Sequence, residues 1–105
     1  MSFPPNLPFT IDQQPDRLVI LIHGDAGQRT DLISQQSYQW ICAISGTVEL
    51  DFSQVPQVNS ILVAWLFHLI QAGRLTSLMV SKANKFVIGQ LKQYYLDRFV
   101  TITYS

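Results

Sequence analysis

The chain has 105 residues, of which 13% are charged, and its seven basic and seven acidic side chains cancel. This length suits one domain with a buried core, so we expect a single domain over residues 1–105. Balanced charge argues against a cationic surface for nucleic acid or an anionic membrane, since either needs a clustered basic excess. Lys82, Lys85, Lys92 and Arg98 do concentrate positive charge late in the chain, and we interpret them as a solvated helix face.

The cysteine content and the apolar segments indicate a cytoplasmic protein. Cys42 is the only cysteine, which excludes an internal disulfide and fits a reducing compartment. Residues 1–8 hold three prolines and predict an extended arm, and they lack the basic-then-apolar pattern of a signal peptide. The most apolar segment, Ile61–Ile70, is far shorter than the about 20 residues that cross a bilayer, so we expect no transmembrane segment.

The first half of the chain predicts two strands and a helix. FTIDQQ (residues 9–14) reads as a short strand, and RLVILIHG (17–24) as a stronger one, because five consecutive aliphatic residues precede a closing glycine. Residues 24–27 form a loop, after which Thr30 or Asp31 caps a segment with helical apolar spacing. That helix extends over about residues 32–44 and stops at Ser45-Gly46.

The second half predicts three strands and two helices. Residues 47–52 (TVELDF) alternate polar and apolar side chains, as in a sheet with one covered face. The later elements are a helix over 60–72, a strand over 75–81, a helix over 85–99 capped by Asn84, and a last strand over 100–105. The apolar residues that share a face of the last helix are Val87, Ile88, Leu91 and Tyr95. The order β-β-α-β-α-β-α-β predicts an α/β fold with a mostly parallel sheet of four to five strands and helices on one face.

The helix over 60–72 is apolar around most of its circumference. Leu62, Leu66 and Leu69 form the centre of the apolar arc and are expected on the sheet. The apolar residues that flank this arc are Ile61 and Trp65 on one side and Val63 and Phe67 on the other. Either neighbouring helices cover these flanks, or a partner protein does.

Ser60 stands at the start of this helix, where free backbone N–H groups and the helix dipole favour negative charge. In one interpretation it is a helix cap that contributes about 1 kcal/mol. In the other it is phosphorylated, which adds about two negative charges beside an apolar surface. A partner that buries this surface would have to desolvate the dianion, so phosphorylation would switch association off.

We expect a partner protein to dock on the residues around this helix start. The predicted partner-binding residues are Asn59, Ser60, Ile61, Val63, Ala64 and Phe67.

Three stretches resemble the STAS domains of anti-sigma-factor antagonists: LVILIHGDA, VELDFSQVPQVNS and LMVSKANKFVIGQLKQYY. In that family a strand ending in a form such as DLSGV leads, a few residues later, to DSSGL at the start of a helix. Residues 51–55 match the first motif and residues 59–63 match the second. Asn59 replaces the aspartate of the second motif, and Ile61-Leu62 replace its Ser-Gly.

The resemblance implies a bacterial, non-enzymatic module that regulates transcription by partner switching. In the family, the serine that matches Ser60 is phosphorylated by a serine kinase that is also an anti-sigma factor. The unmodified form binds that kinase and frees the sigma factor. The resemblance also implies an alternative, a small cytoplasmic STAS subunit of a phospholipid-transporting ABC system whose partner is the ATPase.

His23 offers an enzymatic or metal-binding interpretation. It ends a predicted strand, where ligands bind in open α/β sheets, and Asp25 and Asp51 are candidate neighbours. The spacing matches no metal-ligand motif, and the common nucleophile and phosphate-loop motifs are missing, so we predict no enzyme, no metal and no cofactor. A lipid or other small ligand under the helix over 60–72, and a homodimer through its apolar surface, stay open.

Overall fold

The structure is a computed structural model that describes residues 9–28, 32, 38, 45–72 and 74–102. The predicted arm over residues 1–8 and most of the predicted helix over 32–44, including Cys42, lie outside the described residues. Within the described ranges, no helix has the length and apolar character that a membrane span requires.

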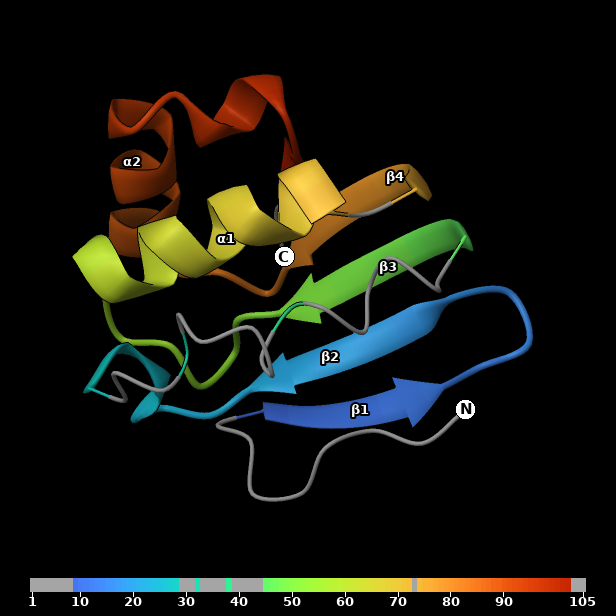
Figure 1. The fold of residues 1–105 in the computed structure, drawn as a ribbon. Helices are drawn as coiled ribbons and strands as arrows, with labels where there is room; N and C mark the ends of the chain where they lie inside the picture. The colour runs from blue at the N-terminus through green and yellow to red at the C-terminus, as the bar shows by residue number, and fades with distance from the viewer. Residues whose placement is uncertain (1–8, 29–31, 33–37, 39–44, 73, 103–105) are drawn as a thin grey trace.

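Five strands form one sheet in the order β1-β2-β3-β4-β5 (Figure 1). They are β1 (Phe9–Gln13), β2 (Leu18–Ile22), β3 (Ser45–Asp51), β4 (Arg74–Ser81) and β5 (Thr101–Ile102). β1 pairs antiparallel with β2 across a short turn, and every later pair of neighbours is parallel. The predicted mostly parallel sheet is therefore confirmed.

Two helices connect the later strands: α1 (Ser60–Ala72) and α2 (Lys85–Gln93). Among the described residues, the short 3-10 helices η1 (Ala26–Gln28) and η5 (Leu96–Arg98) follow β2 and α2. Each parallel strand joins the same growing edge of the sheet, so right-handed crossovers place both helices on one face (Figure 1). The segments that follow β2, β3 and β4 consequently meet at one end of the sheet, where α1 begins.

The alternation predicted for residues 47–52 is present on β3. The buried residues are Val48, Leu50 and Phe52, and the half-buried ones between them are Thr47, Glu49 and Asp51. On the less covered face Glu49 is held by two donors, because Arg17 Nη1 donates to Oε1 at 2.8 Å and Ser81 Oγ donates to Oε2 at 2.9 Å. The hydrophobic core lies on the opposite face of the sheet, which the two helices cover.

The apolar arc of α1 lies against this core. Leu62, Trp65, Leu66 and Leu69 are at most 1% exposed, and burying each such side chain stabilises the fold by about 1.5–3 kcal/mol. The Trp65 ring stacks on Phe9 with ring centroids 5.1 Å apart. Trp65, which the sequence placed on a flank of the helix, is therefore a core residue.

Helix α2 is shorter than predicted, because it ends at Gln93 rather than at residue 99. Tyr95 has a φ of 61°, in the left-handed region, which breaks the helical path before η5 begins. Val87, Ile88 and Leu91 are buried as predicted, but Tyr95 is 64% exposed. The prediction that Tyr95 shares their face is wrong, and Leu96 is the residue that returns to the core.

Candidate functional site

The segment between β3 and α1 is anchored by apolar side chains and backbone hydrogen bonds. Phe52, Val55 and Val58 are at most 3% exposed. The Phe52 N–H donates to Ser81 O at 2.9 Å, and the Val55 N–H donates to Phe52 O at 3.0 Å. The start of α1 therefore rests on a fixed connection.

Helix α2 holds this connection from one side. The Gln90 side chain forms two hydrogen bonds with the Val58 backbone: Nε2 donates to the carbonyl at 2.9 Å, and Oε1 accepts from the N–H at 2.7 Å. Asn84 accepts from the Val87 N–H at 2.7 Å, which confirms it as the α2 cap. Its Nδ2 also reaches Val55 O at 3.5 Å.

Asn59 holds the start of α1 from the other side. Its Oδ1 accepts from the Leu62 N–H at 3.1 Å, the usual geometry of a helix N-cap. Its Nδ2 donates to the Gly27 carbonyl at 2.6 Å. A carboxylate could cap the helix but could not donate, so this contact gives a physical reason for asparagine where the motif has aspartate. A Cβ at Gly27 would lie 2.9 Å from Asn59 Nδ2, so a side chain there would displace the Asn59 amide from this position.

Ser60 is the first residue of α1, and Asn59, not Ser60, is the cap. The Ser60 side chain is exposed. In the part of the chain that the structure describes, no hydrogen bond or ion pair engages its hydroxyl. The hydroxyl is thus presented to solvent at the positive end of a helix of 13 residues.

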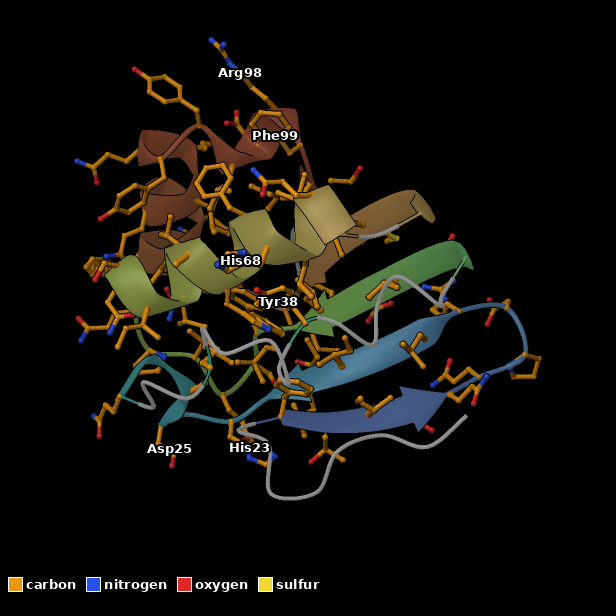
Figure 2. The ribbon with its side chains drawn as sticks, viewed as in Figure 1. His23, Asp25, Tyr38, His68, Arg98 and Phe99 are labelled. Atoms are coloured by element: carbon orange, nitrogen blue, oxygen red, sulfur yellow. The ribbon has the colours of Figure 1, made fainter. Side chains whose placement is uncertain are left out.

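Five exposed or half-buried residues of α1 form one stripe, which we name the docking ridge; Ile61 and Ile70, also half-buried, flank it. It consists of Ser60, Ala64, Phe67, His68 and Gln71, whose spacing repeats every three or four residues. Ser60 and Gln71 are exposed, and the other three are half-buried. Two aromatic rings border the ridge on opposite sides of α1 (Figure 2). They are Tyr38, stacked on His68 at 4.3 Å, and Phe99, edge-on to Phe67 at 6.3 Å.

The ridge differs in part from the predicted docking edge. Ala64 and Phe67 belong to both, and Ile61 is half-buried beside the ridge. Val63 is only 9% exposed, so its side chain faces the core instead of a partner. His68 is half-buried and lies on the ridge itself.

Asp51 ends β3 beside this connection and carries a stable negative charge. Burial alone would raise the pKa of Asp51, but hydrogen bonds from the backbone and side chain of Ser53 and the Lys82 ammonium outweigh it, so the pKa is lowered. The Ser53 N–H donates to Oδ1 at 2.9 Å, and Lys82 Nζ lies 3.6 Å from Oδ2.

In the structure, His23 and Asp51 have different partners. His23 Nε2 and Thr10 Oγ1 are 2.8 Å apart, and Asp51 turns to Ser53 and Lys82. Asp25 is exposed next to η1, close to His23 in Figure 2. Across the described residues, no three side chains from His, Cys, Asp and Glu come together in a way that could hold a metal ion.

Comparison with solved structures identifies the fold. The structure of a candidate anti-sigma factor antagonist from Thermotoga maritima matches with a TM-score of 0.66, covering 92% of this chain and 86% of that one at 15% sequence identity. The chain has a STAS-type fold. No protein-family model and no curated protein matches the sequence. The STAS-type arrangement expected from the sequence motifs is confirmed, and it accounts for the position of Ser60 at the end of the sheet where three connections meet.

Proposed function

We propose that this STAS-type chain is a non-enzymatic protein-binding module that docks a partner on the ridge of α1 and is controlled by phosphorylation of Ser60. The observation that carries the proposal is the exposed Ser60 hydroxyl, which has no hydrogen-bond partner among the described residues and begins a half-apolar ridge. Asn59 and Gln90 fix its position from two sides. A partner would meet a preformed surface, which lowers the entropic cost of binding.

Phosphorylation at this position changes the partner's contact without damaging the fold. The helix N-terminus stabilises the added negative charge. A partner that covers Ala64 and Phe67 would have to desolvate that charge against apolar surface, which opposes binding. Ser60 therefore acts as an off-switch, and a serine kinase with anti-sigma activity is the partner that the family resemblance suggests.

The alternative is a docking module that is always bound, as in a small subunit of a phospholipid-transporting ABC system. The half-buried apolar side chains of the ridge favour it, because a permanent interface is more apolar than a switched one. In this alternative the partner is an ATPase, and Ser60 is an ordinary surface serine.

The test is affinity capture from native lysate with the parent chain and three variants. Ser60→Ala should capture the same partner as the parent, whereas Ser60→Asp should capture at least about tenfold less, because it places a charge on the ridge. Gln13→Asp adds the same charge on β1, away from α1, and should leave capture unchanged. Mass spectrometry of natively purified chain should show phosphoserine at position 60.

The result separates the two proposals. A captured kinase lost with Ser60→Asp supports switching. A captured ATPase that Ser60→Asp retains supports the transport alternative and contradicts the switch. Equal capture by Ser60→Asp and Gln13→Asp rules out Ser60 as the control point whatever the partner is.

A further inference from the structure

The charge of the chain is unevenly distributed, although it sums to zero. Residues 82–99 contain four basic residues and one acidic residue, a net charge of +3. The rest of the chain contains three basic and six acidic residues, a net charge of −3. The basic excess therefore lies in α2 and the short segments before and after it.

The same part carries every large hydrophobic side chain that is clearly exposed among the described residues. They are Phe86 (56%), Tyr94 (43%), Tyr95 (64%) and Phe99 (55%). Phe86 lies in the first turn of α2, whereas the other three follow the end of that helix. Three exposed rings in six residues exceed the scattered apolar residues that an ordinary surface carries.

Tyr95 is not placed there to stabilise the fold. Its left-handed φ of 61° is unfavourable for a residue with a Cβ, and glycine or asparagine is the usual residue after a helix end. Its ring is 64% exposed and so contributes little to the core. A strained backbone that displays a large ring is typical of a residue used for binding.

Two contacts and closeness along the chain group these side chains, which we name the aromatic–basic face: Phe67, Tyr94, Tyr95, Arg98 and Phe99. The Arg98 guanidinium lies 5.2 Å from the centre of the Tyr95 ring. Phe99 contacts Phe67 edge-on at 6.3 Å, and Figure 2 shows Arg98 and Phe99 at the outer end of the helical layer. Aromatic residues and arginine are the types most enriched where protein interfaces concentrate their binding energy.

We propose that the aromatic–basic face binds an acidic protein surface that has an apolar recess for the Phe99 and Tyr95 rings. Arg98 in the face and the excess of basic residues over positions 82–99 around it favour an acidic partner, and the rings supply buried area at small entropic cost. This site shares Phe67 with the docking ridge but lies away from the switch at Ser60, which is seven residues before Phe67 on α1, or about 10 Å along the helix axis.

A membrane fits the face less well than a protein does. A lipid surface is recognised by about four to eight clustered basic residues or by an apolar helix face that inserts. Helix α2 turns Val87, Ile88 and Leu91 into the core, so its outer side offers only Phe86 for insertion. Lys82 is also engaged by Asp51 at 3.6 Å.

A second copy of the chain also fits less well. The acidic residues of the second copy would have to contact the aromatic–basic face. However, Glu49 already pairs with Arg17 at 2.8 Å, and Asp51 pairs with Lys82. Asp16 likewise lies 3.2 Å from Arg17. Three of the six described acidic groups, including the two on β3, are therefore already paired within the chain.

The test uses a synthetic amphipathic helical peptide with leucines along one face and glutamates on the others, titrated into the labelled full chain. We expect amide chemical-shift changes at residues 94–99, and binding that weakens as salt increases. Phe99→Ser should weaken binding at least about tenfold, and Tyr95→Asn should weaken it without lowering the melting temperature. Phe86→Ser is the matched control, because Phe86 is as exposed as Phe99 but lies at the other end of α2.

Further probes have outcomes that would contradict the proposal. A matched peptide with lysine in place of glutamate should bind at least about tenfold more weakly. The proposal fails if the glutamate peptide does not bind, if the lysine peptide binds equally well, or if Phe86→Ser and Phe99→Ser weaken binding equally. It also fails if residues 94–99 respond only to phosphatidylglycerol vesicles, or only to self-association seen by sedimentation. Ser60→Asp should leave peptide binding unchanged, so failure here is distinct from failure of the switch.

Discussion

The start of α1 and the region after the end of α2 are both helix termini at the surface, but they are built differently. At α1, Asn59 caps the helix and also binds the Gly27 carbonyl, so a neutral polar side chain fixes the backbone. After α2, Tyr95 adopts a left-handed backbone and exposes its ring. The hydrogen bonds of Asn59 stabilise the first terminus. At the second, Tyr95 has an unfavourable backbone conformation.

Because of this difference, the two termini present different kinds of groups for binding. The α1 terminus presents one small group, the Ser60 hydroxyl, on a rigid support that a modifying enzyme could recognise. The region after α2 presents large rings and a cation that suit a stable contact. Substitutions at the two termini should therefore change stability in opposite directions.

The largest effect is expected at Asn59. Asn59→Ala removes the α1 cap and the hydrogen bond to Gly27, so the free energy of unfolding should fall by about 2–3 kcal/mol. Asn59→Asp keeps a capping oxygen but places it against the Gly27 carbonyl, so it too should be less stable than the parent. Urea denaturation checks both variants. An aspartate variant as stable as the parent would contradict the role given to this contact.

The next effect concerns the support that α2 gives to the same terminus. Gln90→Ala removes both hydrogen bonds to Val58 and should lower the free energy of unfolding by about 1–2 kcal/mol. Gln93→Ala, an exposed glutamine in the last position of the same helix, should have almost no effect. Equal loss in the two variants would show that helix propensity, and not the link to Val58, is responsible.

A smaller change of opposite sign is expected at Tyr95. Tyr95→Asn relieves the unfavourable left-handed backbone and should raise the free energy of unfolding by up to about 1 kcal/mol. Thermal unfolding followed by circular dichroism measures this gain. A clear loss of stability would mean that the ring contributes to the fold, and the contrast between the termini would disappear.

The smallest effect is a pH dependence at Asp51, beside the α1 terminus. Its pKa is lowered in the folded chain, so its ionised form adds stability above the ordinary value of 3.8, and this contribution is lost as pH falls through the folded value. Partial exposure to solvent limits it to less than about 1 kcal/mol. Asp51→Asn should therefore unfold with a weaker acid dependence than the parent. An unchanged acid profile would refute the assignment to Asp51.

The sequence predicted the fold well where a pattern is local. The alternation around Val48 and Leu50, the bounds of α1 and the Asn84 cap each depend on neighbouring residues, and each is found as predicted. The mostly parallel sheet follows from the alternation of strands and helices. The predicted arm and most of the first helix fall outside the described residues, so they stay predictions.

The features that the sequence did not predict depend on contacts between distant residues. Nothing near Asn59 indicates that its amide reaches Gly27, because the two residues meet only when the sheet is formed. The end of α2 was missed because Tyr95 is not a residue type that normally marks a left-handed turn. Val63 was placed on the docking edge because a helical projection does not show which flank of α1 the rest of the chain buries.

The contact between Asn59 and Gly27 also constrains how this chain can diverge. A side chain at position 27 would meet the amide of Asn59, and an aspartate at position 59 would leave the carbonyl at position 27 without its donor. Homologues should therefore vary at these two positions together, with glycine retained wherever asparagine is. Covariation between sites 32 positions apart would then record, in the history of the family, the hydrogen bond that sets the start of α1.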